Sequence, residues 1–252
     1  MITPLPLVSI LMPLTQDTVY FKTALTSALF QTYDNTEIII RDNTSTNDMK
    51  TMIEKEFLPY YNKIHYIKND IPMNTIELLQ KLTEDSKGTY INFLFEKDLL
   101  YPLKVERMMQ YFLSDKSNTI QFVTSSQGQI NEQGHFIQNG DTNRLFTTDK
   151  RLNGIEYGNN ILKKENEICE LTAPLLRKEK LHEPFGYLRG MPFVHEYIIA
   201  TWLSLLTKGE AIYIADDLSF KRHIPEQKTK NIVQKNEWTQ LISVANQLGY
   251  LT

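Results

Sequence analysis

Residues 89–102 read Thr89-Tyr-Ile-Asn-Phe-Leu-Phe-Glu-Lys-Asp-Leu-Leu-Tyr-Pro102, and this stretch decides the fold. Residues 90–95 are aromatic, aliphatic or β-branched apart from Asn92, which predicts a buried strand. The apolar run stops abruptly at the charged triplet Glu-Lys-Asp of residues 96–98. The stretch therefore predicts a buried strand that ends in a charged turn.

Glu96 and Asp98 place two carboxylates one residue apart at the carboxyl end of this strand. Open α/β sheets bind their ligands at that edge. Carboxylate oxygens in this position suit Mg²⁺ or Mn²⁺ carrying a diphosphate. Two acids in this spacing are also common in solvated turns, so the pair alone leaves a structural turn as the alternative.

The flanking sequence alternates between strand and helix patterns. Strands are predicted at residues 7–14, 37–41, 64–68 and 119–124, and helices at residues 19–31, 48–57, 75–85 and 102–113. This alternation predicts an α/β fold with a mostly parallel sheet, helices on its faces and right-handed crossovers. Carboxyl ends of parallel strands share one edge, so Asp42, after the second strand, is expected beside Glu96 and Asp98.

The pattern is weaker beyond residue 125. A hairpin is predicted around Asn131-Glu-Gln-Gly134, followed by a polar loop at residues 139–153. Helices are predicted at residues 154–163, 177–181, 196–206 and 238–248, and a strand at residues 211–214. The helix at residues 196–206 has the strongest amphipathic pattern of these.

The composition is that of a globular protein: 41% of the 252 residues are hydrophobic and 23% are charged. A net charge of −3 gives no broad electrostatic case for binding nucleic acid. The single cysteine excludes an internal disulfide and fits a cytoplasmic protein. Residues 1–14 are apolar but short and interrupted by prolines, so neither a signal peptide nor a transmembrane segment is expected there.

Several segments, in order along nearly the whole chain, carry a family resemblance. They are Pro6-Leu-Val-Ser-Ile-Leu-Met-Pro13, Ala28-Leu-Phe-Gln-Thr-Tyr33, Glu37-Ile-Ile-Ile-Arg-Asp-Asn43, Lys87-Gly-Thr-Tyr-Ile-Asn-Phe-Leu94, Asp98-Leu-Leu-Tyr-Pro102, Glu183-Pro-Phe-Gly186, Thr201-Trp-Leu-Ser-Leu-Leu206 and Ile214-Ala-Asp-Asp-Leu-Ser219. With them the chain resembles family 2 glycosyltransferases, the GT-A nucleotide-sugar enzymes of bacterial surface polysaccharide and glycoprotein assembly. The resemblance implies a single GT-A domain over residues 1–252, with a nucleotide-sugar-binding half (1–125) and an acceptor-binding half (126–252).

The same resemblance implies a donor site. Asp42 matches the acid that contacts the base, and Glu96 and Asp98 match the outer members of the acidic triplet that holds the ribose and the metal. Arg222, with His223, resembles the basic tail that touches the diphosphate. A uracil N–H suits a carboxylate acceptor, and a diphosphate leaving group suits a divalent Lewis acid. We therefore expect Asp42, Glu96, Asp98 and Arg222 to bind the donor, and Asp98 to hold Mn²⁺ or Mg²⁺.

Two departures from the family pattern affect this expectation. Lys97 stands inside the triplet, where it is expected to weaken cation binding, to pair with phosphate or to point outward. Ile198 occupies the register position of the catalytic-base aspartate and cannot accept a proton. Glu196 is the remaining candidate for the base, although it lies two positions out of register on the helix, with His195 beside it.

The sequence thus predicts an inverting transfer of a sugar, expected from a UDP-sugar, to a glycan, a lipid-linked acceptor or a glycoprotein. The alternative is a GT-A fold retained as a binding or partner module, which Lys97 and Ile198 favour. Under this alternative, Asp42 only caps the following helix, and Arg222 is a solvated basic residue.

Overall fold

The computed structural model describes residues 4–16, 19–137, 144–163, 170–224 and 234–251. Its strands are β1 (Val8–Leu14), β2 (Thr36–Asp42), β3 (Ile64–Lys68), β4 (Tyr90–Phe93), β5 (Leu99–Leu100), β6 (Ile120–Ile130), β7 (Lys150–Asn153), β8 (Leu175–Arg177), β9 (Tyr187–Leu188), β10 (Met191–Pro192) and β11 (Glu210–Arg222). Its α-helices are α1 (Phe21–Leu29), α2 (Asp48–Glu56), α3 (Thr75–Asp85), α4 (Lys104–Ser114), α5 (Gly154–Leu162), α6 (Tyr197–Leu206) and α7 (Gln234–Asn246). A 3-10 turn, η1, covers Lys178–Lys180.

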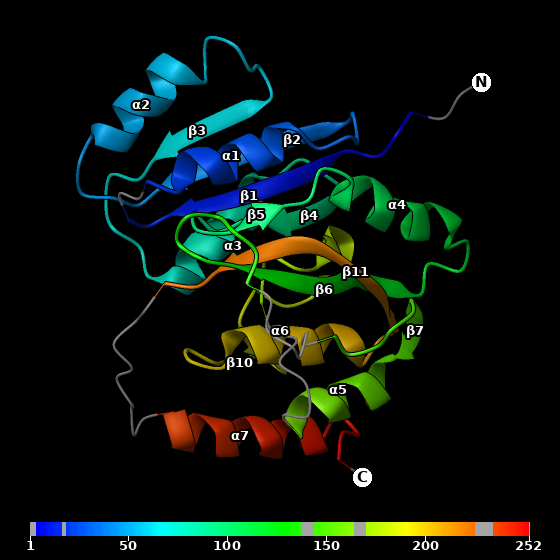
Figure 1. Cartoon of the computed structure of the whole chain (residues 1–252). Helices are drawn as coiled ribbons and strands as arrows, with labels where there is room; N and C mark the ends of the chain where they lie inside the picture. The colour runs from blue at the N-terminus through cyan, green and yellow to red at the C-terminus, as the bar shows by residue number, and fades with distance from the viewer. Residues whose placement is uncertain (1–3, 17–18, 138–143, 164–169, 225–233, 252) are drawn as a thin grey trace.

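One main sheet runs through the molecule in the order β3-β2-β1-β4-β8-β6-β11-β5, with β7 paired to β11 (Figure 1). The strands β3, β2, β1 and β4 are all parallel, as are β6 and β11. The predicted mostly parallel α/β sheet is therefore confirmed. Strands from beyond residue 125 continue this sheet directly, since β8 pairs with β4.

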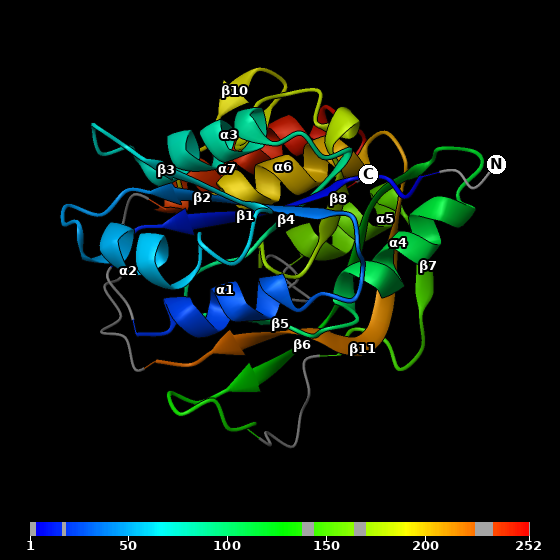
Figure 2. The ribbon, with the colours of Figure 1, turned by 90° about the horizontal axis from the view of Figure 1, so that it is seen from above.

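Helices cover both faces of the sheet (Figures 1 and 2). The apolar faces of α1, α2 and α4 pack on one face of the sheet, and those of α3, α5 and α6 pack on the other. The last helix, α7, lies farther out and packs on α5 and α6 rather than on the sheet. Alternate residues along β1 and β2 face opposite layers, which explains why both strands are apolar throughout.

The structure differs from the sequence expectations at three places in the C-terminal half. Arg177, expected in a helix, ends β8, a three-residue strand that lies antiparallel between β4 and β6. Of the expected loop at residues 139–153, residues 139–143 lie outside the described residues, and residues 150–153 form β7. The strand expected at residues 211–214 continues to Arg222, because register shifts between Ile214 and Ser219 let the chain keep pairing with β6 past two aspartates. These differences matter because β8 and β11 carry residues to the candidate site.

Candidate functional site

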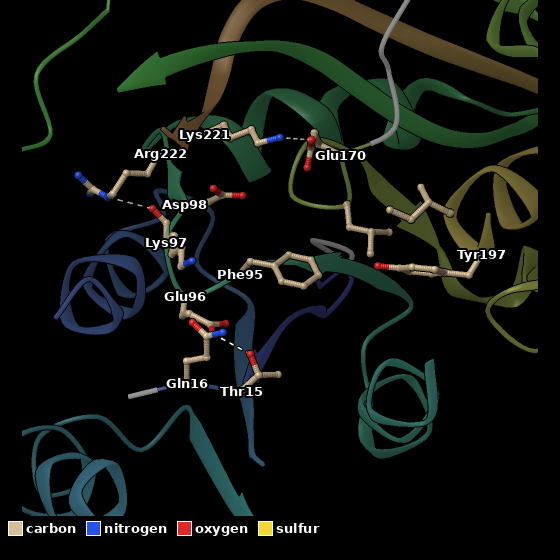
Figure 3. A pocket seen from close by; sticks show the side chains of 12 residues that line it. Thr15, Gln16, Phe95, Glu96, Lys97, Asp98, Glu170, Tyr197, Lys221 and Arg222 are labelled. Atoms are coloured by element: carbon tan, nitrogen blue, oxygen red, sulfur yellow. Dashed lines mark hydrogen bonds and ion pairs between the residues drawn. The ribbon is translucent and has the colours of Figure 1, made fainter. Parts of the chain in front are cut away.

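A cavity of about 320 Å³ opens at the carboxyl ends of β1 and β4 (Figure 3). Its walls come from four parts of the chain: the ends of these strands, the segment before β8, the first turn of α6 and the end of β11. Cavities of this size are typical of small-molecule sites. The lining residues are Thr15, Gln16, Phe95, Glu96, Lys97, Asp98, Glu170, Leu171, Tyr197, Ile198, Lys221 and Arg222.

Glu96 is almost completely buried at the floor of this cavity. Its Oε1 accepts a hydrogen bond of 2.9 Å from the Thr15 hydroxyl, and the backbone amide of Thr15 donates to the same carboxylate. Burial raises the pKa of Glu96, and these hydrogen bonds oppose that rise. The side chain thereby ties the turn after β1 to the turn after β4.

Asp98 is also buried, and its Oδ2 accepts a hydrogen bond of 2.6 Å from the Thr172 hydroxyl. The backbone amide of Arg222 donates to the same carboxylate. Burial raises the pKa of Asp98 to about 6, well above the ordinary value for an aspartate. Asp98 therefore joins three segments: the β4 turn, the segment before β8 and the end of β11.

Three cationic side chains line the same cavity (Figure 3). The guanidinium of Arg222 is buried and donates to the backbone carbonyls of Lys97, Asn131 and Glu132, at 3.2, 2.8 and 3.0 Å. The ammonium of Lys221 pairs with the Glu170 carboxylate across the cavity. Lys97 is half-buried, and Figure 3 shows its side chain between those of Glu96 and Asp98.

Asp42 lies at the predicted strand end but does not line this cavity. It is fully buried, and its carboxylate accepts hydrogen bonds from the Thr44 amide, the Thr44 hydroxyl, Tyr66 and Lys68 at 2.8, 2.7, 2.6 and 3.1 Å. Burial and the hydrogen bond to Asp42 raise the pKa of the Tyr66 hydroxyl. Contact with a nucleotide base would require a partner of Asp42 to be displaced, and that contact stays a prediction.

The first turn of α6 forms one wall of the cavity. Glu196 is the N-cap residue of this helix and is not among the lining residues, whereas Tyr197 and Ile198 are. The Glu237 carboxylate of α7 accepts hydrogen bonds of 2.6 and 3.0 Å from the backbone amides of His195 and Glu196, and so caps the helix. The isoleucine in the register position of the base thus faces the cavity, and the role of Glu196 stays a prediction.

Buried polar side chains donate hydrogen bonds to the backbone of the segment before β8. The Asn92 amide donates to the carbonyls of Thr172 and Pro174, at 3.1 and 2.7 Å. The ammonium of Lys104, which is fully buried, donates to the carbonyl of Ala173. Burial lowers the pKa of Lys104 to about 7. These contacts fix the position from which Thr172 donates to Asp98.

The acids of this site fit a divalent cation poorly. The chain's own hydroxyl and amide groups already donate to both Glu96 and Asp98, and Lys97 lies between them in sequence. Over the residues that the structure describes, no group of three or more His, Cys, Asp or Glu side chains is arranged to hold a metal ion. Hard divalent cations need several oxygen ligands, and an adjacent ammonium opposes their binding.

Comparison with solved structures defines the class of fold. The TarS 1–349 fragment of S. aureus in complex with UDP-GlcNAc superposes with a TM-score of 0.68 over 94% of this chain and 66% of that chain, at 11% sequence identity. The same fragment in complex with UDP gives a TM-score of 0.66, over 96% of this chain and 64% of that one. At such low identity the likeness shows the fold, which is GT-A as predicted.

The sequence defines the family. The chain belongs to glycosyl transferase family 2, whose model matches residues 9–183. It is 30% identical over 194 residues to WfaP of Escherichia coli, a UDP-Glc:α-D-GlcNAc-diphosphoundecaprenol β-1,3-glucosyltransferase, covering 77% of this chain and 67% of the relative. An uncharacterized glycosyltransferase of Rickettsia bellii is 27% identical over 239 residues. The chain spans 32% of that relative's length.

Several residues that line the cavity or contact its acids were not predicted from the sequence, among them Thr15, Glu170, Thr172, Tyr197 and Lys221. The strand-end rule that found Asp42 would also have found Thr15, which directly follows β1. Glu170 and Thr172 gave no signal, because they enter the site only through the pairing of β8 with β4.

No helix in the described part of the chain is long and apolar enough to cross a membrane.

Proposed function

We propose that this chain binds a nucleoside diphosphate sugar, a UDP-sugar in the first instance, in the strand-end cavity and transfers the sugar with inversion. The acceptor is the hydroxyl of a glycan, a lipid-linked saccharide or a glycoprotein, and the reaction takes place in the cytoplasm. The observation that carries the proposal is the cavity at the carboxyl ends of β1 and β4, where Glu96, Asp98 and the basic end of β11 meet. Family membership and the UDP-sugar named for WfaP support it.

The proposed roles of Asp42 and Glu196 come from the family resemblance, and those of Glu96, Asp98 and Arg222 also from their place at the cavity. Asp42 contacts the base, and Glu96, Asp98 and Arg222 shape the part of the cavity that receives the ribose and the diphosphate. Glu196 is the proposed base, which removes the proton of the acceptor hydroxyl as that oxygen attacks the anomeric carbon opposite the leaving diphosphate. Aligning acceptor oxygen, anomeric carbon and leaving group accounts for a large part of the rate.

A donor panel tests the proposal. UDP-glucose, UDP-N-acetylglucosamine and sugar donors with other bases are incubated with the protein, and release of the nucleoside diphosphate is followed with and without saccharide acceptors. Glu196→Gln should slow release by about 10²–10⁴-fold while leaving nucleotide affinity unchanged. A wild-type protein that binds none of these donors would refute the proposal.

A specific observation favours a second function, that of a non-catalytic binding module. Ile198, in the register position of the base, lines the cavity, whereas Glu196 does not. Such a module would bind nucleoside diphosphates without turnover, and Glu196→Gln would change nothing. Ile198→Asp distinguishes the two functions, because it places a carboxylate in the cavity. Turnover gained only in this variant would show that the site binds donor but lacks its base.

A further inference from the structure

The residues between and beside the two acids suggest how the cavity neutralises its ligand. We propose that the donor diphosphate is neutralised by the ammonium groups of Lys97 and Lys221 in place of a divalent cation. This inference rests on the proposed function, since it concerns the diphosphate of the same donor. It differs from the sequence expectation that Asp98 holds Mn²⁺ or Mg²⁺.

Both acids of the cavity already accept hydrogen bonds from the chain itself. The Glu96 carboxylate accepts from the Thr15 hydroxyl and the Thr15 amide, and the Asp98 carboxylate accepts from the Thr172 hydroxyl and the Arg222 amide. These bonds hold together the turns that form the cavity floor. A cation bound directly by Glu96 and Asp98 would compete with hydrogen bonds that maintain the shape of the site.

Two lysine ammonium groups lie where a bound diphosphate can reach them. Lys97 and Lys221 both line the cavity, from the β4 turn and from the end of β11. Figure 3 shows the Lys221 side chain directed toward Glu170 at the edge of the cavity. Both residues of this pair are 43% exposed, so an incoming phosphate can reach the ammonium. An ammonium donates up to three hydrogen bonds and is a common phosphate partner in proteins.

Arg222 holds the backbone of Lys97 in place. The Arg222 guanidinium donates to the Lys97 carbonyl at 3.2 Å and lies 4.4 Å from the centre of the Tyr20 ring. Because the same guanidinium also binds the carbonyls of Asn131 and Glu132, it is already used within the protein. Arg222 therefore acts as a positioning residue for the turn that carries Lys97, and the two lysines supply the charge that meets the phosphates.

Calorimetric titration of UDP tests the inference. The titration is run on metal-stripped protein in EDTA and again in excess Mn²⁺, with GDP and CDP titrated in parallel. The affinity for UDP should agree within about threefold between the two conditions. Lys97→Gln and Lys221→Gln should each weaken UDP binding about tenfold or more, the usual loss for a charge-assisted hydrogen bond. Uridine binding should not change in either variant, which a general structural defect would not allow.

Two further variants sharpen the test. Glu170→Gln releases Lys221 from its carboxylate partner and should tighten UDP binding without added metal. Lys55→Gln, at an exposed lysine of α2, is the matched control and should leave affinity unchanged.

Binding of UDP only in Mn²⁺, or tighter binding in Lys97→Gln, would overturn the inference and leave the proposed function standing. Failure of every nucleoside diphosphate to bind under both conditions would overturn the proposed function, and this inference with it.

Discussion

Replacing Lys104, the buried lysine next to the segment before β8, should change how the free energy of unfolding depends on pH. Lys104 is fully buried in the first turn of α4, next to the Met108 sulfur at 3.5 Å and the Ala173 carbonyl. Burial lowers its pKa from 10.5 to about 7. Lys104→Met keeps the length and apolar bulk of the side chain but removes the titrating group.

The sign of the pH effect follows from proton binding in the two states. Between about pH 7 and pH 10.5 the unfolded chain holds a proton on Lys104 that the folded chain has lost. The free energy of unfolding therefore rises with pH across this window, because the state that binds more protons becomes less favourable. Below about pH 7 both states are protonated, and Lys104 adds no further pH dependence. From about pH 7 to about pH 9 the rise attributable to Lys104 is about 2 kcal/mol.

Urea unfolding of the wild type and of Lys104→Met at these two pH values measures the effect. The difference in free energy of unfolding between the two proteins should shift by about 2 kcal/mol in favour of the wild type as the pH rises. Lys55→Met, at an exposed lysine of α2, controls for the loss of one positive charge. Parallel pH dependence in the wild type and Lys104→Met would refute the reasoning.

Three further outcomes are expected. Asp42→Ala should weaken UDP binding by about 1.5–3 kcal/mol, the value of a charged hydrogen bond, and unchanged affinity would remove Asp42 from the donor site. Glu237→Gln should lower the free energy of unfolding by about 1–2 kcal/mol, because the carboxylate accepts from amides at the start of α6; an unchanged urea midpoint would contradict this cap. Gly154→Ala should lower the free energy of unfolding by about 3 kcal/mol or more, because the added Cβ would lie 1.9 Å from the Leu206 carbonyl oxygen. A decrease of less than about 1 kcal/mol would show that α5 can shift freely.

The strand-end residues were predictable from the sequence because they depend on local patterns. The apolar runs ending at Asp42 and before Glu96 are parallel strands, and parallel strands bring their carboxyl ends to one edge. The fold of the first 125 residues follows from this alternation. The length of β11 did not follow, because Asp216 and Asp217 break its apolar pattern, and its pairing with β6 carries it past them to Lys221 and Arg222.

Features set by long-range pairing were not predictable. A lysine in the first turn of an amphipathic helix normally faces solvent. Lys104 is buried instead, and its ammonium donates a hydrogen bond to the carbonyl of Ala173, which is remote in sequence. Likewise, a helix was predicted at residues 177–181, yet Arg177 ends a strand that pairs with β4 and β6, and this pairing brings Thr172 to Asp98. In both cases the decisive partner is remote in sequence.

A structure of the protein with UDP bound tests the central claim most directly. The proposed function predicts the diphosphate in the cavity at the ends of β1 and β4, near Glu96, Asp98 and Arg222, with the uracil directed toward Asp42. UDP bound elsewhere on the protein would contradict the proposed function. UDP in this cavity with its phosphates turned away from both Lys97 and Lys221 would contradict only the inference that these lysines neutralise the diphosphate.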